Sequence, residues 1–284
     1  MDYSLENFVK KHDKVICIDS DGTMIDAMNV KHRRCHGASF IDLWGLNDKA
    51  DEVQKVWDAI NLFEKSRGVN RFIALEEMLR RCENRGWITL DPDDFKVYCD
   101  WVAEGKISNK ALAEEIQHND SPLLKKAYEW SVELNKRIES ITSADKPPYE
   151  GAREALEYAK GKCDIAIISS SNMAAIVKEW SDHDLIKYVD VITSQEIGSK
   201  NACIARMLTK GYGKEDILMM GDAYPDVDAA AENGVWYYPI LTRHEKESWN
   251  EFHDKYFDIF LAGKYSECQK ELLDRFENNF DKNE

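Results

Sequence analysis

The sequence predicts an α/β protein built on a doubly wound parallel sheet, with an all-helical domain inserted after the first strand. Three observations support this fold class: an apolar strand at 14–18, purely helical periodicity over 28–146, and alternating strand and helix patterns from 151 to 241. Because the first strand finds no partner before the alternating region, we expect it to pair with the later strands. The predicted domains are a core, 1–27 with 147–284, and the inserted helical block between them.

Each predicted element of the core follows from a local pattern. The first strand is uninterruptedly apolar, which is typical of a strand buried on both faces of a parallel sheet. Four more apolar runs predict strands, and helical periodicity lies between them. These strands are 164–168, 189–193, 216–220 and 235–241, and the helices lie near 151–160, 171–182, 200–210 and 225–233. In the tail, 245–284, aromatic residues at helical spacing predict helices that pack and carry no chemistry.

The inserted block shows helical signals throughout. Apolar residues such as Trp57 and Trp130 recur at helical spacing, so we expect them in the core of this domain. Asp91-Pro92 and Ser121-Pro122 each place a capping residue before a proline that suits the first helical turn. A proline pair and a glycine within 143–151 then indicate the connector back to the sheet.

Composition narrows the classes of partner. The chain has 284 residues and a formal net charge of −15, which disfavours nonspecific binding to nucleic acid or to an anionic membrane. It contains no apolar run of about 18 residues, the length that a spanning helix requires. The seven cysteines are scattered and form no CxxC pair, which indicates reduced thiols. We therefore expect a cytoplasmic protein without nucleic-acid or membrane partners.

Polar side chains follow the predicted strands at the points where these strands end. Because the carboxyl ends of parallel strands meet at one edge of a sheet, we expect these side chains to converge. They are Asp19, Asp21 and Thr23 after the first strand, Ser169 and Ser170 after the second, then Lys200, and finally Asp222 and Asp226. Carboxylates suit a hard cation such as Mg²⁺, while a hydroxyl and an ammonium suit phosphate oxygens. Phosphoryl transfer explains this set, and the alternative for the first two acids is an ordinary turn rich in Asp and Gly.

The same residues resemble the motifs of the haloacid dehalogenase (HAD) superfamily, in its phosphohydrolase branch. The family's first motif, DxDGT, reads Asp19-Ser-Asp-Gly-Thr23 here, and a last motif resembling GDxxxD reads Gly221-Asp-Ala-Tyr-Pro-Asp226. Ser169 stands at the position of the second motif and Lys200 at that of the third. The resemblance covers residues 14–233 and implies a Rossmann-like core, with the inserted block as a helical cap of the C1 type.

The resemblance also implies a role for each acid. Asp19 is expected to be the nucleophile that accepts the phosphoryl group as an aspartyl-phosphate, and also a Mg²⁺ ligand. Asp21 is expected to protonate the leaving oxygen and then to activate the hydrolytic water, while its backbone carbonyl binds the metal. Asp222 is implied as a further ligand. Asp226 is either an indirect ligand through water or a cap at the start of its helix.

Hydroxyl and ammonium groups are expected to complete the site. Thr23 borders the substrate and is expected to orient Asp21 by a hydrogen bond, while Ser169 and Lys200 hold the transferring oxygens. The run Ser169-Ser-Ser171 leaves the register open by one residue, which makes Ser170 a second candidate for substrate binding. The plain alternatives are a strand-end hydroxyl that satisfies local backbone and a solvated surface lysine.

Two basic clusters in the inserted block are further candidates. Arg67 and Arg71 flank a glycine-broken junction between two helices, where guanidiniums suit a substrate carboxylate or a second phosphate. The alternative is that they cap a helix or pair with nearby acids. His32 and His36 have the spacing of a helical metal pair but no evident third ligand, so we expect a solvated helix face or a hinge.

These observations together predict a Mg²⁺-dependent phosphatase that hydrolyses a small phosphorylated metabolite through an aspartyl-phosphate. The resemblance implies that the halide- and phosphonate-cleaving branches of the family lack a second aspartate, so Asp21 favours an oxygen-linked leaving group. A phosphomutase on the same scaffold is one alternative, and a phosphometabolite-binding module without turnover is another.

Overall fold

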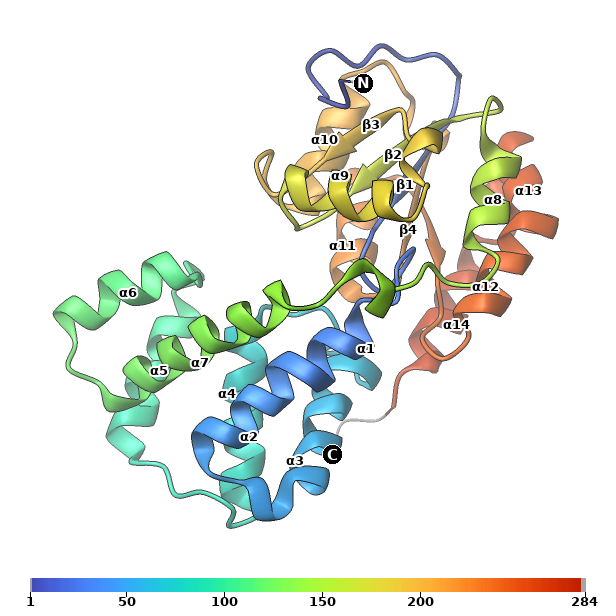
Figure 1. Cartoon of the computed structure of the whole chain (residues 1–284). Coiled ribbons are helices and arrows are strands. Elements are labelled where there is room, and N and C mark those ends of the chain that lie inside the picture. Colours follow the sequence, from blue (N-terminus) through green and yellow to red (C-terminus); the bar gives the residue numbers. More distant parts are fainter. Residues whose placement is uncertain (1, 282–284) are drawn as a thin grey trace. The chain divides into compact units, whose positions relative to one another are not determined.

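The computed structural model of the chain describes residues 2–281, which form two compact units. Residues 2–27 and 143–280 make up the first, named the sheet unit, and 28–142 with Asp281 make up the second, named the helical unit. Both are drawn in Figure 1. In the described part of the chain, no helix is both long and apolar enough to cross a bilayer.

The sheet unit is built on five parallel strands in the order β3-β2-β1-β4-β5 (Figure 1). They are β1 (Val15–Ile18), β2 (Asp164–Ile168), β3 (Val191–Thr193), β4 (Ile217–Gly221) and β5 (Trp236–Pro239). The predicted fold class is thereby confirmed, and the first strand does pair with the later ones. β3 begins at Val191 and not at the predicted residue 189, because the 3-10 turn Ile186–Tyr188 and the two residues after it precede the strand.

Helices cover both faces of this sheet because successive residues of a strand point to opposite sides. Ile16 and Ile18 of β1 pack on one side with α8 (Ala152–Ala159), α9 (Met173–Asp182), α12 (Glu245–Glu251) and α13 (Phe257–Leu261). Val15 and Cys17 pack on the other side with α10 (Lys200–Leu208) and α11 (Tyr224–Asn233). α14 (Gln269–Asn279) contributes side chains to both clusters.

The helical unit has its own core, in which Trp57 and Trp130 are fully buried as predicted. Its helices are α1 (Met28–Lys31), α2 (Ala38–Trp44), α3 (Ala50–Asp58), α4 (Arg71–Asn84), α5 (Pro92–Ala103), α6 (Asn109–His118) and α7 (Pro122–Glu139). Two helix starts also agree with the sequence. The Asp91 side chain accepts hydrogen bonds from the first turn of α5, and Ser121 does the same for α7.

The expectation of a solvated face at His32 and His36 is wrong. Both side chains are buried, at 8% and 9% exposure, on the π-helical segment His32–Gly37. The Trp57 indole N–H donates to His32 Nδ1 at 3.2 Å, and the two Nδ1 atoms of the histidines also lie 3.2 Å apart. A π turn adds a residue to the helical repeat, so a regular helical period does not predict which side faces the core.

Candidate active site

The carboxyl ends of β1, β2 and β4 bring three of the predicted loops to one edge of the sheet. β1 pairs in parallel with both β2 and β4. The Asp19 amide extends this ladder by donating to the Met220 carbonyl at 3.0 Å. Ser169 directly follows β2, and Asp222 directly follows Gly221, the last residue of β4. The two acids and the one hydroxyl that follow these strands therefore lie at the same edge of the sheet.

Three carboxylates and one ammonium form the centre of the site. Oxygens of Asp19, Asp222 and Asp226 all lie within 4.8 Å of one another. Their residues are 5%, 2% and 0% exposed. Lys200 Nζ lies 3.0 Å from Asp19 Oδ1 and 2.6 Å from Asp226 Oδ1, so this lysine belongs to the site and not to the solvated surface. The charges of three acids thus face one cation.

The electrostatics of the cluster show its shortage of positive charge. Burial raises the pKa of Asp19 well above its ordinary value, and the charges of Asp226 and Asp222 add to this effect while Lys200 opposes it. Burial likewise raises the pKa of Asp226. Burial alone lowers the pKa of Lys200, but attraction to Asp19 and Asp226 outweighs it, so the net shift is upward. The lysine stays charged, and the acids need more cation than it supplies.

The donor set fits a hard divalent cation. All the candidate ligand atoms of Asp19, Asp222 and Asp226 are oxygens, the type that Mg²⁺ prefers. A second cation among these carboxylates would offset the charge that Lys200 leaves uncompensated. The predicted use of the Asp21 backbone carbonyl as a ligand stays a prediction.

Asp226 caps its helix, as one of the two alternatives predicted, and also pairs with Lys200, while its role as an indirect metal ligand stays a prediction. Its Oδ2 accepts a hydrogen bond from the Ala223 amide at 3.3 Å, which caps the start of α11, while its Oδ1 pairs with Lys200. The carboxylate reaches this position because Gly221 has no side chain: a Cβ at residue 221 would collide with the Asp226 carboxyl group. The absence of a side chain at Gly221 therefore leaves the space that the Asp226 carboxylate occupies.

Thr23 contacts a different acid from the one predicted. Its hydroxyl donates to Asp222 Oδ1 at 2.6 Å, not to Asp21. A hydroxyl has a single proton to donate, so the expected hydrogen bond to Asp21 is wrong. Asp21 itself is half-buried and lies outside the three-carboxylate cluster. Gly22, between Asp21 and Thr23 in the chain, adopts a φ of 87°. This left-handed conformation favours glycine and turns the loop back on itself.

The serine run after β2 separates into a buried and an exposed residue. Ser169 is buried, and its Oγ accepts a hydrogen bond from the Ser171 amide at 3.1 Å. Ser170 is exposed. The hydroxyl proton of Ser169 is not used in that contact, which leaves it available to a ligand oxygen, and the role of both serines stays a prediction.

The two arginines of the helical unit differ in their surroundings. Arg67 is buried and donates to the Leu62 carbonyl at 3.1 Å. Arg71 donates to Asn135 Oδ1 at 2.7 Å and to Ser131 Oγ at 3.3 Å, and burial lowers its pKa. Within the described residues Arg71 has no carboxylate partner, and the cap of α4 is the neighbouring Asn70. The alternative of an acid-paired or capping residue therefore does not hold for Arg71.

Sequence reasoning missed two aromatic residues that hydrogen bond to the site's loops. Tyr237 donates its hydroxyl to the Gly221 carbonyl, and Trp249 donates its indole N–H to the Thr23 carbonyl. Tyr237 lies in the strand predicted at 235–241, and Trp249 lies in the tail that was predicted to pack and carry no chemistry. Their aromatic character signalled burial, but no pattern in the sequence distinguishes a packed tyrosine from one that binds a motif carbonyl.

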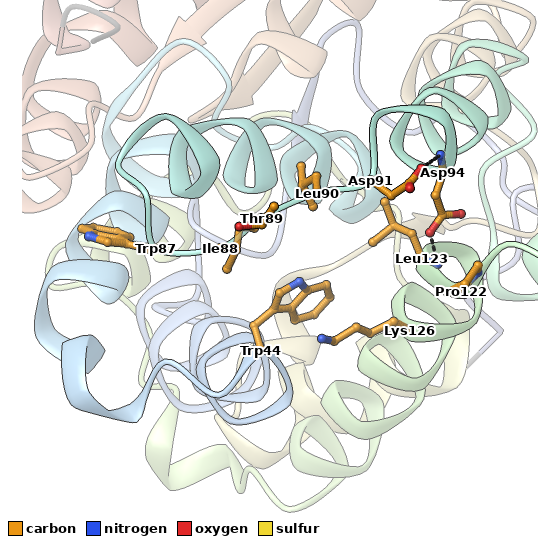
Figure 2. Close-up of a pocket in the computed structure, with 10 residues that line it drawn as sticks. All are labelled: Trp44, Trp87, Ile88, Thr89, Leu90, Asp91, Asp94, Pro122, Leu123 and Lys126. Carbon is orange, nitrogen blue, oxygen red and sulfur yellow. Dashed lines mark hydrogen bonds between the residues drawn. The ribbon is translucent and has the colours of Figure 1, made fainter.

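A cavity within the helical unit was also not predicted. It has a volume of about 370 Å³ and lies between the end of α2, the extended segment 87–91 and the start of α7 (Figure 2). Its lining includes two indoles, three aliphatic side chains and Lys126. In the sequence these residues belong to three separate stretches, in which only helix-start signals were noted and no binding motif.

The model of one protein family, the haloacid dehalogenase-like hydrolases, matches residues 14–234 of the chain. No curated protein sequence matches this chain. Among solved structures, a protein of Clostridium difficile provisionally named a phosphatase is similar at a TM-score of 0.50 and 15% identity, over 81% of this chain and 86% of that one.

Two further solved structures are similar over comparable lengths. A haloacid dehalogenase-like family hydrolase of Streptococcus pneumoniae has a TM-score of 0.48 at 14% identity, over 83% of this chain and 90% of that one. A Thermotoga maritima protein provisionally named a β-phosphoglucomutase has a TM-score of 0.44 at 16% identity, over 80% of this chain and 84% of that one.

Proposed function

Because the chain belongs to the haloacid dehalogenase-like hydrolases, we propose that it is a Mg²⁺-dependent phosphatase that hydrolyses a small phosphorylated metabolite through an aspartyl-phosphate. The observation that carries this proposal is the buried group of Asp19, Asp222 and Asp226 around Lys200. Three carboxylates repel an anionic substrate unless cations offset them, and phosphoryl transfer is a reaction that uses such an arrangement. Asp19, Asp222 and, through water, Asp226 would hold Mg²⁺, which supplies charge neutralisation when bound.

The chain's own residues account for the first half of the reaction. A carboxylate oxygen of Asp19 attacks the phosphorus, and the bond between phosphorus and the ester oxygen breaks. Asp21 gives its proton to that oxygen, so the product leaves as an alcohol. Lys200, with Ser169, holds the oxygens of the transferring group as their charge shifts.

The second half returns the enzyme to its starting state. A water molecule gives a proton to the Asp21 carboxylate and attacks the phosphorus of the aspartyl-phosphate. The bond between phosphorus and the Asp19 oxygen breaks, which releases inorganic phosphate. Asp21 has then regained the proton that it lost, and Asp19 is again a free carboxylate.

The helical unit is assigned the role of the family's cap, which selects the substrate. Arg71 supports this role because it is a half-buried guanidinium that, among the residues the structure describes, is held by the neutral groups of Ser131 and Asn135. A guanidinium in such surroundings keeps donors for a carboxylate or a second phosphate on a substrate. Arg67 is the weaker candidate because it is buried and donates to a backbone carbonyl.

A screen of phosphorylated metabolites with and without Mg²⁺ tests the proposal. The expected result is stoichiometric release of inorganic phosphate from one chemical group of substrates, dependent on the metal. Accumulation of an isomeric sugar phosphate without phosphate release indicates a phosphomutase instead. Binding of a metabolite with no turnover under any condition indicates a module that has lost its activity.

Asp21→Asn is expected to separate the two half-reactions. The amide has no proton of suitable acidity for an alkoxide, but an aryl phosphate with a good leaving group needs none, so slow phosphorylation of Asp19 should survive. The aspartyl-phosphate should then accumulate, because the amide cannot accept a proton from water. Rapid-quench detection of the phosphoprotein and steady-state phosphate release measure these steps. An unimpaired rate with an alkyl phosphate contradicts the acid and base role.

A further inference from the structure

Two aromatic side chains from the chain beyond the family match hydrogen bond to the motif loops. The match ends at residue 234, whereas Tyr237 lies on β5 and Trp249 on α12. The Tyr237 hydroxyl donates to the Gly221 carbonyl at 2.8 Å, and the Trp249 indole N–H donates to the Thr23 carbonyl at 3.0 Å. The two residues are 2% and 0% exposed, so water does not compete for these bonds.

Both contacts lead to Asp222. Gly221 is its chain neighbour, so the hydrogen bond from Tyr237 holds the backbone that precedes this acid. Thr23 is held at its carbonyl by Trp249, and its hydroxyl in turn donates to Asp222 Oδ1 at 2.6 Å. The carboxylate is therefore oriented twice, once through its own backbone and once through its side-chain oxygen.

The tail also holds Tyr237 itself. The side chain of Gln269 accepts from the Tyr237 amide at 2.8 Å and donates to the Tyr237 carbonyl at 3.2 Å. The Tyr265 hydroxyl donates to the same carbonyl at 3.2 Å. β5 is one of the two edge strands of the sheet, and these contacts take up backbone groups that such an edge leaves unpaired.

We propose that residues 235–280 form a positioning segment for Asp222, with Tyr237 and Trp249 as positioning residues that act through Gly221 and Thr23. This inference rests on the proposed function, because it takes Asp222 as a metal ligand. Neither aromatic residue is assigned a contact with metal or substrate. Groups that hold a ligand in place set metal affinity, since a misdirected carboxylate must be reoriented before it binds.

Isothermal titration of Mg²⁺ into Tyr237→Phe and Trp249→Phe tests the proposal without reference to turnover. Each change removes one hydrogen-bond donor and keeps an aromatic ring. Each variant is expected to bind Mg²⁺ about tenfold more weakly than the wild type, as removal of groups behind a metal ligand generally does. The double variant should bind more weakly than either single variant.

Tyr98→Phe is the matched control. The Tyr98 hydroxyl is also fully buried and also donates to a backbone carbonyl, that of Phe72 at 2.9 Å, but it belongs to the helical unit. It should lower the temperature of unfolding and leave Mg²⁺ affinity unchanged. The same pattern in Tyr237→Phe and Trp249→Phe overturns the positioning role and leaves the proposed function standing. A wild type that binds no Mg²⁺ overturns the proposed function, and the inference with it.

The cavity of the helical unit carries a second inference from independent observations. Figure 2 shows the Trp44 indole and the Lys126 side chain on one side of it, with Ile88 and Leu90 on the other. Lys126 Nζ lies 4.8 Å from the centre of the Trp44 ring. A volume of about 370 Å³ is within the range of small-ligand sites, and the apolar groups give an aromatic ring surfaces to contact.

The acids that line this cavity are already hydrogen-bonded, whereas its lysine lies over the Trp44 ring and forms no ion pair among the described residues. Asp91 accepts hydrogen bonds from the amides of Asp93 and Asp94 at 3.0 Å, and Asp94 accepts from the Leu123 amide at 2.9 Å and from Ser121. These bonds place both carboxylates at the positive ends of α5 and α7.

Lys126, in contrast, forms no ion pair among residues 2–281, and burial lowers its pKa. An ammonium without an ion pair, next to an indole, is suited to an aromatic ring that bears an anionic group.

We infer that the cavity binds a small aromatic carboxylate, whose ring packs between Trp44 and the segment Ile88–Leu90 and whose carboxylate pairs with Lys126. Titration with 2-naphthoate, followed by calorimetry or ligand-detected NMR, should show binding that the cationic analogue 2-naphthylmethylamine does not share. Lys126→Gln should weaken 2-naphthoate binding about tenfold, as expected for loss of one charge-assisted hydrogen bond.

Lys125→Gln is the control for this test, because Lys125 is the adjacent lysine, is exposed and pairs with Asp120. It should leave the affinity for 2-naphthoate unchanged. Trp44→Leu should weaken binding by removing the aromatic surface. Equal binding of the amine, no binding of 2-naphthoate, or an affinity that Lys126→Gln does not change overturns the assignment.

Discussion

Asp19→Asn is expected to abolish phosphate release, by at least about 10³-fold, because loss of a covalent nucleophile removes the reaction path that the site supports. The amide has nearly the same shape as the carboxylate, so the sheet and its loops should be unchanged. Phosphate release and trapping of the phosphoprotein measure the effect. Asp216→Asn is the control, since Asp216 lies at the opposite end of β4 and pairs with Lys14. Turnover near the wild-type rate in Asp19→Asn would contradict the assignment of the nucleophile.

The same substitution is expected to stabilise the protein when Mg²⁺ is absent. Burial raises the pKa of Asp19 in the folded state, so the folded protein binds the proton more tightly than the unfolded chain does. The stability of the wild type therefore falls as pH rises above the unfolded pKa of about 3.9. An amide carries no such charge, and Lys200 keeps Asp226 as a partner at 2.6 Å. Thermal unfolding at pH 7 in EDTA should give a higher midpoint for Asp19→Asn than for the wild type.

Added Mg²⁺ should reverse this order. A ligand that binds only the folded state at 100 times its Kd stabilises by about 2.7 kcal/mol, and the variant with one carboxylate fewer should gain less. Equal midpoints for variant and wild type in EDTA would show that the charge of Asp19 is already compensated without a divalent cation.

The carboxyl edge of the sheet, where the candidate site lies, was predictable because its causes are local in the sequence. An uninterrupted apolar run indicates a buried parallel strand, and the residue after such a run lies at the carboxyl edge whatever the rest of the chain does. Asp19, Ser169 and Asp222 are placed by this rule alone. Lys200 required more, since it follows a loop, and only its contacts with Asp19 and Asp226 distinguish it from other lysines.

Partners that come from distant parts of the chain were not predictable. Thr23 and Asp222 are 199 residues apart, and which acid receives the Thr23 hydroxyl depends on the register between β1 and β4. Spacing in the sequence favours the near neighbour, Asp21, as the acceptor of this hydroxyl. It does not show how β1 and β4 are aligned. The hydrogen bonds of Tyr237 and Trp249 depend on the same packing, and a single sequence records only that these residues are aromatic and large.

Lys200→Met is expected to be the most destabilising change at the site. It leaves the carboxylates of Asp19 and Asp226 buried without the ammonium that now lies within 3.0 Å of both. Removing one partner of a buried ion pair generally costs about 3–5 kcal/mol, because the remaining charge keeps its desolvation penalty. Urea unfolding in EDTA at pH 7 should show a loss of this size. Lys214→Met is the control. Lys214 is an exposed lysine just before β4, and it forms no ion pair with the carboxylates of the cluster.

The pH dependence of Lys200→Met distinguishes lost charge compensation from lost packing. Lys200 opposes the upward pKa shifts of Asp19 and Asp226, so without it both pKa values should rise further in the folded state. Groups with raised folded pKa values stabilise the fold in their protonated form, so the deficit should shrink as pH falls toward about 4. A packing defect would be the same at every pH.

Mg²⁺ should restore part of the stability of Lys200→Met at pH 7, because it also offsets the carboxylates. It should not restore phosphate release, since the transferring oxygens still lack their ammonium. A stability deficit that is independent of both pH and Mg²⁺ would contradict the view that Lys200 serves the charge balance of this site.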